Sequence, residues 1–147
     1  MNRHDRERQL AQYLVPVSQR WRRLADLALA ELRISNSSGW CLIFLARIGP
    51  DARQTDLAQV IGISQPSLVR TLNQLQAAGL LARAPNPGDG RSNLLVITPE
   101  GRTLVDQIEA KLTSLRHSLL DGISDQDLET TLRVMGHLTN RIAERRI

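Results

Sequence analysis

Residues 54–81 read QTDLAQVIGISQPSLVRTLNQLQAAGLL, and the pattern of this stretch predicts two short helices joined by a tight turn. One face of the first helix is apolar and holds Leu57, Ala58 and Ile61. Gly62 follows at the point where helices commonly end in a left-handed residue. Ser64 is suited to cap the second helix, and Pro66 is suited to its first turn, where the N–H that proline lacks has no partner.

The second helix is predicted to have one apolar face and one polar face. The apolar positions follow the helical repeat and are Leu68, Val69, Leu72 and Leu75. The opposite positions carry short polar side chains and a single charge, and they are Ser67, Arg70, Thr71 and Gln74. Such side chains can hydrogen-bond the edges of bases, whereas an ordinary solvated face holds more Glu and Lys. The pattern is typical of a helix that enters the major groove of DNA, with Ser64, Gln65 and Pro66 at its N-terminus.

A β-hairpin is predicted directly after this helix pair. Residues 80–98, LLARAPNPGDGRSNLLVIT, alternate in character at 81–84 and 94–98, around a loop rich in Pro, Gly, Asn and Asp. A helix-turn-helix followed by such a hairpin is a winged helix, whereas an αα-hairpin without a partner explains only the helices. At the expected loop tip, Arg91 is suited to enter a minor groove, and Asp89 is suited to hold its guanidinium in place.

Three stretches of the chain resemble the MarR family of bacterial regulators, and its SlyA branch most closely. They are DLAQVIGISQPSLVRTLNQLQAAGLLAR, GDGRSNLLVITPEG and DGISDQDLE. The resemblance runs roughly from residue 40 to the C-terminus. It implies a homodimeric winged-helix transcription regulator that binds a pseudo-palindromic operator in double-stranded DNA. In many such proteins a small aromatic acid releases the DNA, and Trp21 and Trp40 are the candidate residues for binding that effector here.

The wing departs from the family pattern at two positions. Asp89, Arg91 and Thr98 match the residues that the family usually has. Asn93 and Leu94 stand where basic residues are frequent, so the returning strand should hold phosphate less strongly than in typical relatives.

We predict a mainly α fold with one small β-hairpin, organised in three parts. Residues 1–36 form an N-terminal dimerisation helix, 37–99 the winged helix-turn-helix reading head, and 100–147 two C-terminal dimerisation helices. The N-terminal helix has an apolar seam that steps by four and three residues, namely Leu10, Leu14, Val17, Trp21, Leu24 and Ala28. Pro16 predicts either a kink or the start of the main helix. A buried helix is expected at 40–48, capped by Ser37 or Ser38.

Two further helices are predicted after the hairpin. Thr98 is expected to cap the first, with Pro99 at its first position, and Ser124 is expected to cap the second. Their apolar stripes are Leu104, Ile108, Leu112, Leu115 and Leu119, and then Leu128, Leu132, Met135, Leu138 and Ile142. These stripes exceed what a small reading head can cover, which predicts a homodimer.

Composition and motifs narrow the function further. The chain has 147 residues, 41% of them hydrophobic, and a formal net charge of +4. No apolar run approaches the ~18 residues that a membrane span needs, and the N-terminus lacks the apolar core of a signal peptide. With one cysteine and no possible intrachain disulfide, we expect a cytoplasmic protein. Cys41 stands in an apolar stretch, which favours a core residue over a redox centre.

We expect neither an enzyme nor a bound cofactor or metal. No nucleophile has a base nearby, and neither a phosphate-binding glycine loop nor zinc-finger spacing occurs in the sequence. Two alternatives stay open: a winged-helix module that docks another protein, and a metal-sensing regulator that uses His117 and His137. A protein-docking face would be apolar, whereas the predicted one is polar, and the two histidines have no evident third ligand.

Overall fold

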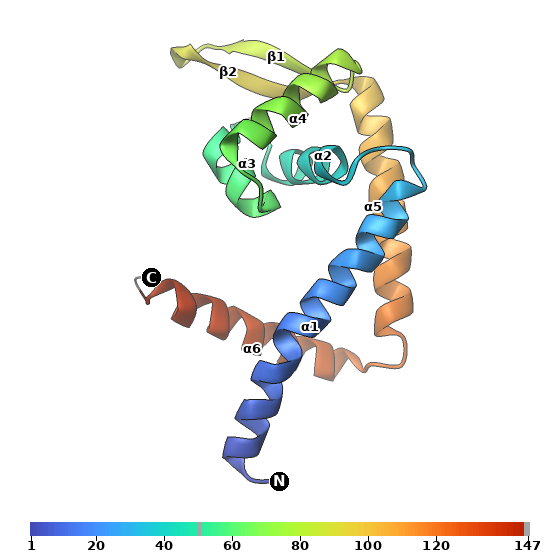
Figure 1. The fold of residues 1–147 in the computed structure, drawn as a ribbon, viewed down its shortest axis with the longest axis vertical. Coiled ribbons are helices and arrows are strands. Elements are labelled where there is room, and N and C mark those ends of the chain that lie inside the picture. Colours follow the sequence, from blue (N-terminus) through green and yellow to red (C-terminus); the bar gives the residue numbers. More distant parts are fainter. Residues whose placement is uncertain (50, 146–147) are drawn as a thin grey trace. The chain divides into compact units, whose positions relative to one another are not determined.

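The computed structural model describes residues 1–49 and 51–145, except for the side chains of residue 89 and residues 91–93. This described part contains six helices and one antiparallel hairpin (Figure 1), which confirms the predicted mainly α fold. The elements are α1 (Arg3–Ala30), α2 (Asn36–Ile48), α3 (Gln54–Ile61), α4 (Gln65–Ala77), β1 (Leu81–Asn86), β2 (Asp89–Ile97), α5 (Pro99–Leu120) and α6 (Asp125–Ala143). They form two compact units, Met1–Leu115 and Arg116–Ile147. Among the described residues, no helix combines the length and the apolarity that crossing a membrane requires.

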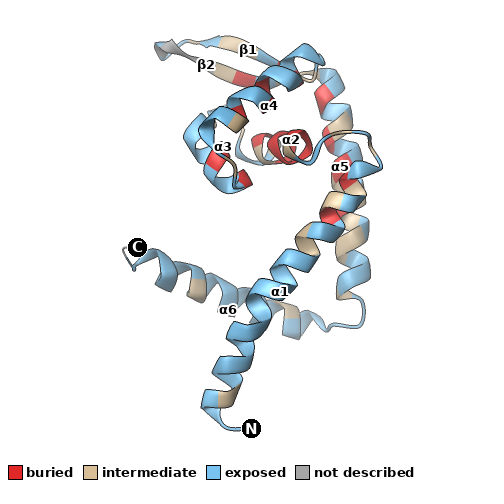
Figure 2. Ribbon diagram, viewed as in Figure 1, coloured by how far each residue is buried: buried red, intermediate tan, exposed pale blue. Residues whose placement is uncertain are grey.

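Helix α2 is the centre of the first unit. It packs against α1, α3, α4 and β2, and residues 38–43 and Leu45 are all buried. Figure 2 shows buried residues on α2 and on parts of α3, α4 and α5. The core is mostly aliphatic, as the scarcity of aromatic residues in the sequence requires. The expectation that 40–48 forms a buried helix is therefore confirmed for residues 40–43 and 45, whereas Ile48 is exposed.

The start of α2 corrects the sequence-based prediction. The helix begins at Asn36 rather than at Trp40, and its N-cap is Ser35 rather than Ser37 or Ser38. The Ser35 hydroxyl accepts the N–H of Ser38 at 3.2 Å, and Ser38 itself is buried in the first turn. Several serines in a row can each serve as a cap, so the choice among them depends on which one the tertiary packing leaves outside the helix.

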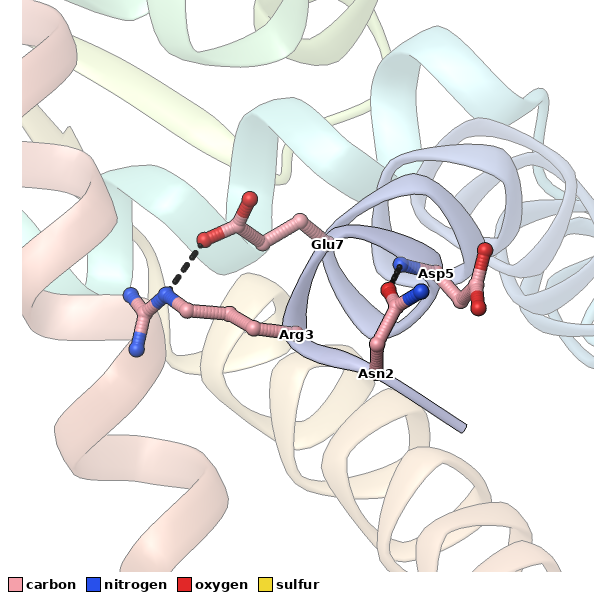
Figure 3. A network of polar contacts seen from close by, with 4 residues as sticks. All are labelled: Asn2, Arg3, Asp5 and Glu7. Carbon is pink, nitrogen blue, oxygen red and sulfur yellow. Dashed lines mark hydrogen bonds and ion pairs between the residues drawn. The ribbon is translucent and has the colours of Figure 1, made fainter.

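Helix α1 runs without a break through Pro16, so the alternative that the helix starts at this proline is wrong. Its start is fixed further upstream, where the Asn2 side chain accepts the N–H of Asp5 at 2.9 Å (Figure 3). An exposed ion pair between Arg3 and Glu7, 2.8 Å apart, adds an i,i+4 contact on the first turn.

The hairpin is longer than predicted and its loop is shorter. Strand β1 pairs with β2 from Leu81 opposite Ile97 to Asn86 opposite Asp89, which leaves a turn of Pro87 and Gly88. The Asn86 side chain accepts the N–H of Gly88 at 3.0 Å, and this contact stabilises the turn. The prediction that Asp89 and Arg91 lie in a long loop is therefore wrong, because the backbone places both in β2. Their side chains lie outside the described part of the structure.

The start of α5 is hydrogen-bonded to Gly79 and Leu80, which lie between α4 and β1. Thr98 caps α5 as predicted, since its hydroxyl oxygen accepts the N–H of Gly101 at 3.1 Å. The same hydroxyl donates to the carbonyl of Gly79 at 2.6 Å, and the Thr98 N–H donates to the carbonyl of Leu80 at 3.2 Å. Gly101 is buried against this carbonyl, and an added Cβ would lie 2.1 Å from its oxygen. A side chain at residue 101 therefore has no room.

The second unit contains the end of α5 and helix α6. Ser124 caps α6 as predicted, with its hydroxyl accepting the N–H of Asp127 at 3.1 Å. None of the residues of α6, all of which the structure describes, is buried. By contrast, the stripe of α5 is largely covered within the chain, because Ile108 and Leu112 are buried in the first unit. The prediction that the α5 stripe depends on a partner for cover is wrong for these two residues.

Candidate nucleic-acid interface

The turn between α3 and α4 is formed by the residues that the sequence predicts. Gly62 ends α3 in the left-handed conformation, with φ 81° and ψ 35°, and its N–H donates to the carbonyl of Ala58. Ser64 caps α4, its hydroxyl accepting the N–H of Ser67 at 3.3 Å, and Pro66 lies in the first turn. These local signals confirm the helix-turn-helix from Gln54 to Ala77.

The exposed face of α4 is rotated from the one that the sequence predicts. Thr71 is buried and its hydroxyl donates to the carbonyl of Ser67 at 3.0 Å, whereas Val69 is 40% exposed. The buried stripe is therefore Leu68, Thr71, Leu72 and Leu75, spaced i, i+3, i+4 and i+7. A threonine methyl group packs like that of valine once its hydroxyl is hydrogen-bonded within the helix. Burial of residue 71 therefore follows from its position in the helical repeat and not from the polarity of its side chain. The predicted accessibility of Thr71 is wrong.

The exposed face of α4 is polar at its centre. Arg70 and Gln74 are exposed, as are Gln65 and Pro66 in the first turn, while Ser67 is half-buried and accepts a hydrogen bond from the Ser64 hydroxyl at 2.9 Å. Asn73, which the sequence analysis did not select, is also exposed. It follows Arg70 by three residues, so the helical repeat places it on the same face. The same repeat would have found it in the sequence.

Arg83 connects the hairpin to this face. It lies half-buried in β1 and donates from Nη1 to Oε1 of Gln76 and from Nη2 to Oδ1 of Asn73, each at 3.1 Å. Both acceptors are exposed side chains of α4. A rigid guanidinium that binds two side chains one turn apart holds the base of the hairpin and α4 in a fixed relation.

The two tryptophans differ in their surroundings. Trp40 is 8% exposed, and its indole N–H donates to the Asp26 carboxylate at 2.8 Å. The Arg22 guanidinium lies 4.0 Å from the Trp40 ring centroid, and the Phe44 ring stacks at 5.9 Å. Trp21 is half-buried on α1. Trp40 is thus already packed and hydrogen-bonded, which leaves little of its surface for a ligand.

A small cavity lies between α2, β2 and the start of α5. It has a volume of about 120 Å³ and is lined by Leu45, Gly49, Leu95, Val96, Ile97 and Arg102. Its lining is apolar apart from Arg102. At this volume it holds a few waters or a very small organic molecule.

Cys41 is fully buried in α2, and burial raises the pKa of its thiol from 9.0 to about 11. We therefore expect the folded protein to resist a thiol reagent such as Ellman's reagent at pH 8, and to react only after unfolding.

Because the pKa of the Cys41 thiol is higher in the folded than in the unfolded protein, the stabilising contribution of the neutral thiol is complete below pH 9.0 and is lost as the pH rises towards about 11. Urea titrations of the parent and of Cys41→Ala across this range measure the loss. An equal pH dependence in both proteins would contradict it.

His117 and His137 are both exposed on their helices. Within the described residues, no group of three His, Cys, Asp or Glu side chains is placed to hold a metal ion.

Comparison with known proteins agrees with this geometry. Residues 34–92, which contain α2, α3, α4 and most of the hairpin, match the model of the MarR family. The solved structure of transcriptional regulator PA3341 is 30% identical to this chain, with 92% of this chain and 99% of that chain covered and a TM-score of 0.84.

Two further structures share the fold at lower identity. MarR of Staphylococcus aureus, solved with salicylate and kanamycin, is 18% identical over 95% of this chain and 94% of that chain, with a TM-score of 0.80. A MepR variant of S. aureus bound to an oligodeoxyribonucleotide is 21% identical over 90% and 97% of the two chains, with a TM-score of 0.58.

Proposed function

Because the chain belongs to the MarR family of transcriptional regulators, we propose that it is a non-enzymatic regulator that binds a pseudo-palindromic operator as a homodimer. The observation that carries the proposal is the exposed polar face of α4, held at one end by the Ser64 cap and at the side by Arg83. The MepR relative solved with an oligodeoxyribonucleotide supports DNA as the partner. Membership of the SlyA branch remains a prediction that rests on the quoted motifs.

We propose that some residues of α4 contact DNA phosphates and that others contact base edges. Ser64, Gln65 and Pro66 stand at the N-terminus of α4, where the helix dipole favours a phosphate. Arg70 and Gln74 are exposed further along the helix and contact base edges in the major groove. Ser67, half-buried and bonded to Ser64, orients the first turn. Thr71 supports the helix from inside and does not reach the DNA in this conformation.

The direct test of base reading is Arg70→Ala. We expect it to weaken specific operator binding by ~1–3 kcal/mol, because a bidentate arginine contact to guanine is lost, and to relax specificity at one pair in each half-site. Fluorescence anisotropy with operator and with scrambled DNA measures both effects. Arg133→Ala, which removes an equal charge from an exposed position of α6, is the control and should leave the base preference unchanged. Parental affinity in Arg70→Ala would remove this residue from the interface.

The hairpin is the proposed wing, with Asp89 and Arg91 at the start of β2 next to the two-residue turn. We propose that Arg91 enters the minor groove beside each half-site and that Asp89 orients its guanidinium. A narrow minor groove over A·T pairs has the strongest negative potential, so the flanks of the operator should be A·T-rich.

We propose that 1–36 and 100–147 form the dimerisation region and 37–99 the reading head. The support is the apolar surface that the described chain leaves exposed on α1 and α6. On α1 it comprises Leu10, Tyr13, Leu14, Val15, Val17, Leu24 and Leu27, and on α6 Leu132, Val134, Met135 and Ile142. Exposed apolar surface arranged along whole helices marks a protein interface rather than a solvated surface.

We expect a dimer in sedimentation equilibrium at micromolar concentration. Leu132→Glu should produce monomers, because Leu132 is 71% exposed in the single chain and a charge there would be buried without a partner in the dimer. Val60→Glu, at a 47% exposed apolar residue of α3, is the matched control and should remain dimeric. A stable monomer formed by the parent protein would contradict the assembly that we propose.

The effector that we propose is a small aromatic acid, a class supported by the S. aureus MarR structure with salicylate. Trp21 and Trp40 remain the candidate contacts, but a ligand that reaches the Trp40 ring has to compete with Arg22. Such a ligand weakens DNA binding only if it prefers the conformation that does not fit the operator.

Selection of bound sequences from a random DNA pool tests the central proposal. A recovered palindrome with half-sites about one helical turn apart would support DNA recognition and the dimer together. Failure to enrich any sequence would favour the protein-docking alternative, for which the partly apolar edge of α4 at Val69 is the one supporting feature.

A further inference from the structure

We propose that Arg83 is a positioning residue that sets which base Asn73 reads, by holding the Asn73 amide in one orientation. The inference rests on the function proposed above and adds a residue outside the recognition helix to the determinants of specificity. It starts from the two hydrogen bonds of 3.1 Å that the Arg83 guanidinium donates to Asn73 and Gln76.

The chemistry of the guanidinium allows only one orientation of the amides that it contacts. Arginine has five N–H donors and no acceptor, so an amide that contacts it has to present its oxygen. Oδ1 of Asn73 therefore faces Nη2 of Arg83, and the NH₂ group of Asn73 is turned away from β1. The same holds for Gln76, whose Oε1 faces Nη1. Each amide keeps two N–H donors and loses the free choice between its two orientations.

Asn73 lies where this restriction matters. It is exposed, three residues after Arg70 and one before Gln74, and these three positions lie within about 100° of one another around the helix. A free asparagine reads adenine with both groups, its oxygen accepting from N6 and its NH₂ donating to N7. Because the Asn73 oxygen is turned towards Arg83, and one of its two lone pairs is engaged there, the NH₂ group is the part of the amide that is placed to contact a base. We therefore assign Asn73 to an acceptor edge in the major groove, that of guanine (N7 and O6) or thymine (O4).

Arg83 is suited to this role by its own location. It is half-buried in β1, opposite Leu95 of β2, whereas the amides that it binds belong to the exposed face of α4. Held from the side by a strand, the guanidinium does not need to enter the groove to influence it. Its replacement should change base preference at one pair, whereas loss of a direct phosphate contact would weaken binding to all sequences alike.

The test is selection from a random DNA pool with the full-length parent, Arg83→Met, Asn73→Ala and the double variant. In the parent we expect guanine or thymine at one pair in each half-site. Arg83→Met frees the amide to turn, so binding of the operator with adenine at this pair should improve roughly tenfold relative to the selected base. Asn73→Ala should lose the preference at the same pair. The double variant should behave like Asn73→Ala, because Arg83 acts through Asn73.

Two further variants provide an independent test and a control. Asn73→Asp still accepts from Arg83 but has no donor, so it should bind the operator at least tenfold more weakly than the parent even if Arg83→Met fails to fold. Gln74→Ala is the matched control, since Gln74 is not one of the two acceptors of Arg83. Its effect should fall on another pair and should add independently to that of Arg83→Met.

The outcomes separate this inference from the function on which it rests. If the parent enriches no sequence, the proposed function falls and the inference falls with it. If the parent enriches an operator but Arg83→Met keeps the same base preference, only the inference is overturned. A uniform loss of affinity in Arg83→Met, with a salt slope lower by about one, would overturn it as well, because Arg83 would then contact phosphate itself.

Discussion

Gly101→Ala should lower the free energy of unfolding by ~3 kcal/mol or more, the largest effect that we expect from adding a single methyl group. The new Cβ would lie 2.1 Å from the backbone oxygen of Leu80 and 2.8 Å from Cγ2 of Ile97. The Leu80 oxygen also accepts the N–H of Thr98, so it cannot move away without breaking that hydrogen bond. Relief has to come from displacing the whole first turn of α5.

Gly136→Ala is the control for this experiment. Gly136 is also inside a helix, but a Cβ built there meets no atom within 4 Å. We expect it to be neutral or to stabilise by ~0.5–1 kcal/mol, because alanine is the better helix former. Urea unfolding followed by circular dichroism measures both variants. Equal stability of the two would show that α5 and the end of α4 do not approach as closely as the structure has them.

The second large effect concerns Trp40, where we expect Trp40→Ala to cost ~3–5 kcal/mol of stability. The substitution empties a buried site and removes three contacts at once, namely the hydrogen bond to Asp26, the Arg22 guanidinium over the ring and the stacked Phe44. Trp40 belongs to α2, whereas Asp26 and Arg22 belong to α1, so the first two contacts hold these helices together. The Phe44 ring stacks on Trp40 within α2.

Two milder variants separate packing from hydrogen bonding at this site. Trp40→Phe keeps most of the ring but leaves Asp26 without its indole donor, so we expect a cost of ~1–2 kcal/mol. Trp21→Ala should cost less than Trp40→Ala, since Trp21 is only half-buried. Thermal unfolding of the three variants ranks them directly. If Trp21→Ala proved the more damaging, Trp21 and not Trp40 would be the main contact between α1 and the reading head.

Local chemistry explains what could be predicted at the reading head. The Gly62 end of α3, the Ser64 cap and the Thr98 cap each depend on residues close in sequence, so the sequence alone locates them. Where the local sequence allows more than one cap or turn, tertiary packing decides which one forms. Ser35 rather than Ser37 or Ser38 caps α2, and the strands extend to a two-residue turn at Pro87 and Gly88.

The candidate site divides in the same way. The sequence by itself determined that α4 is an amphipathic helix with Arg70 and Gln74 on its polar side, because hydrophobic spacing at the helical repeat orients it. Only the tertiary structure decided that Thr71 faces inward and Val69 outward, because the core selects by position and accepts a threonine whose hydroxyl is satisfied by its own helix. Likewise, no local sequence pattern predicts that Arg83 binds Asn73 and Gln76. The contact exists because the hairpin folds back beside α4 and brings together residues that are seven and ten positions apart.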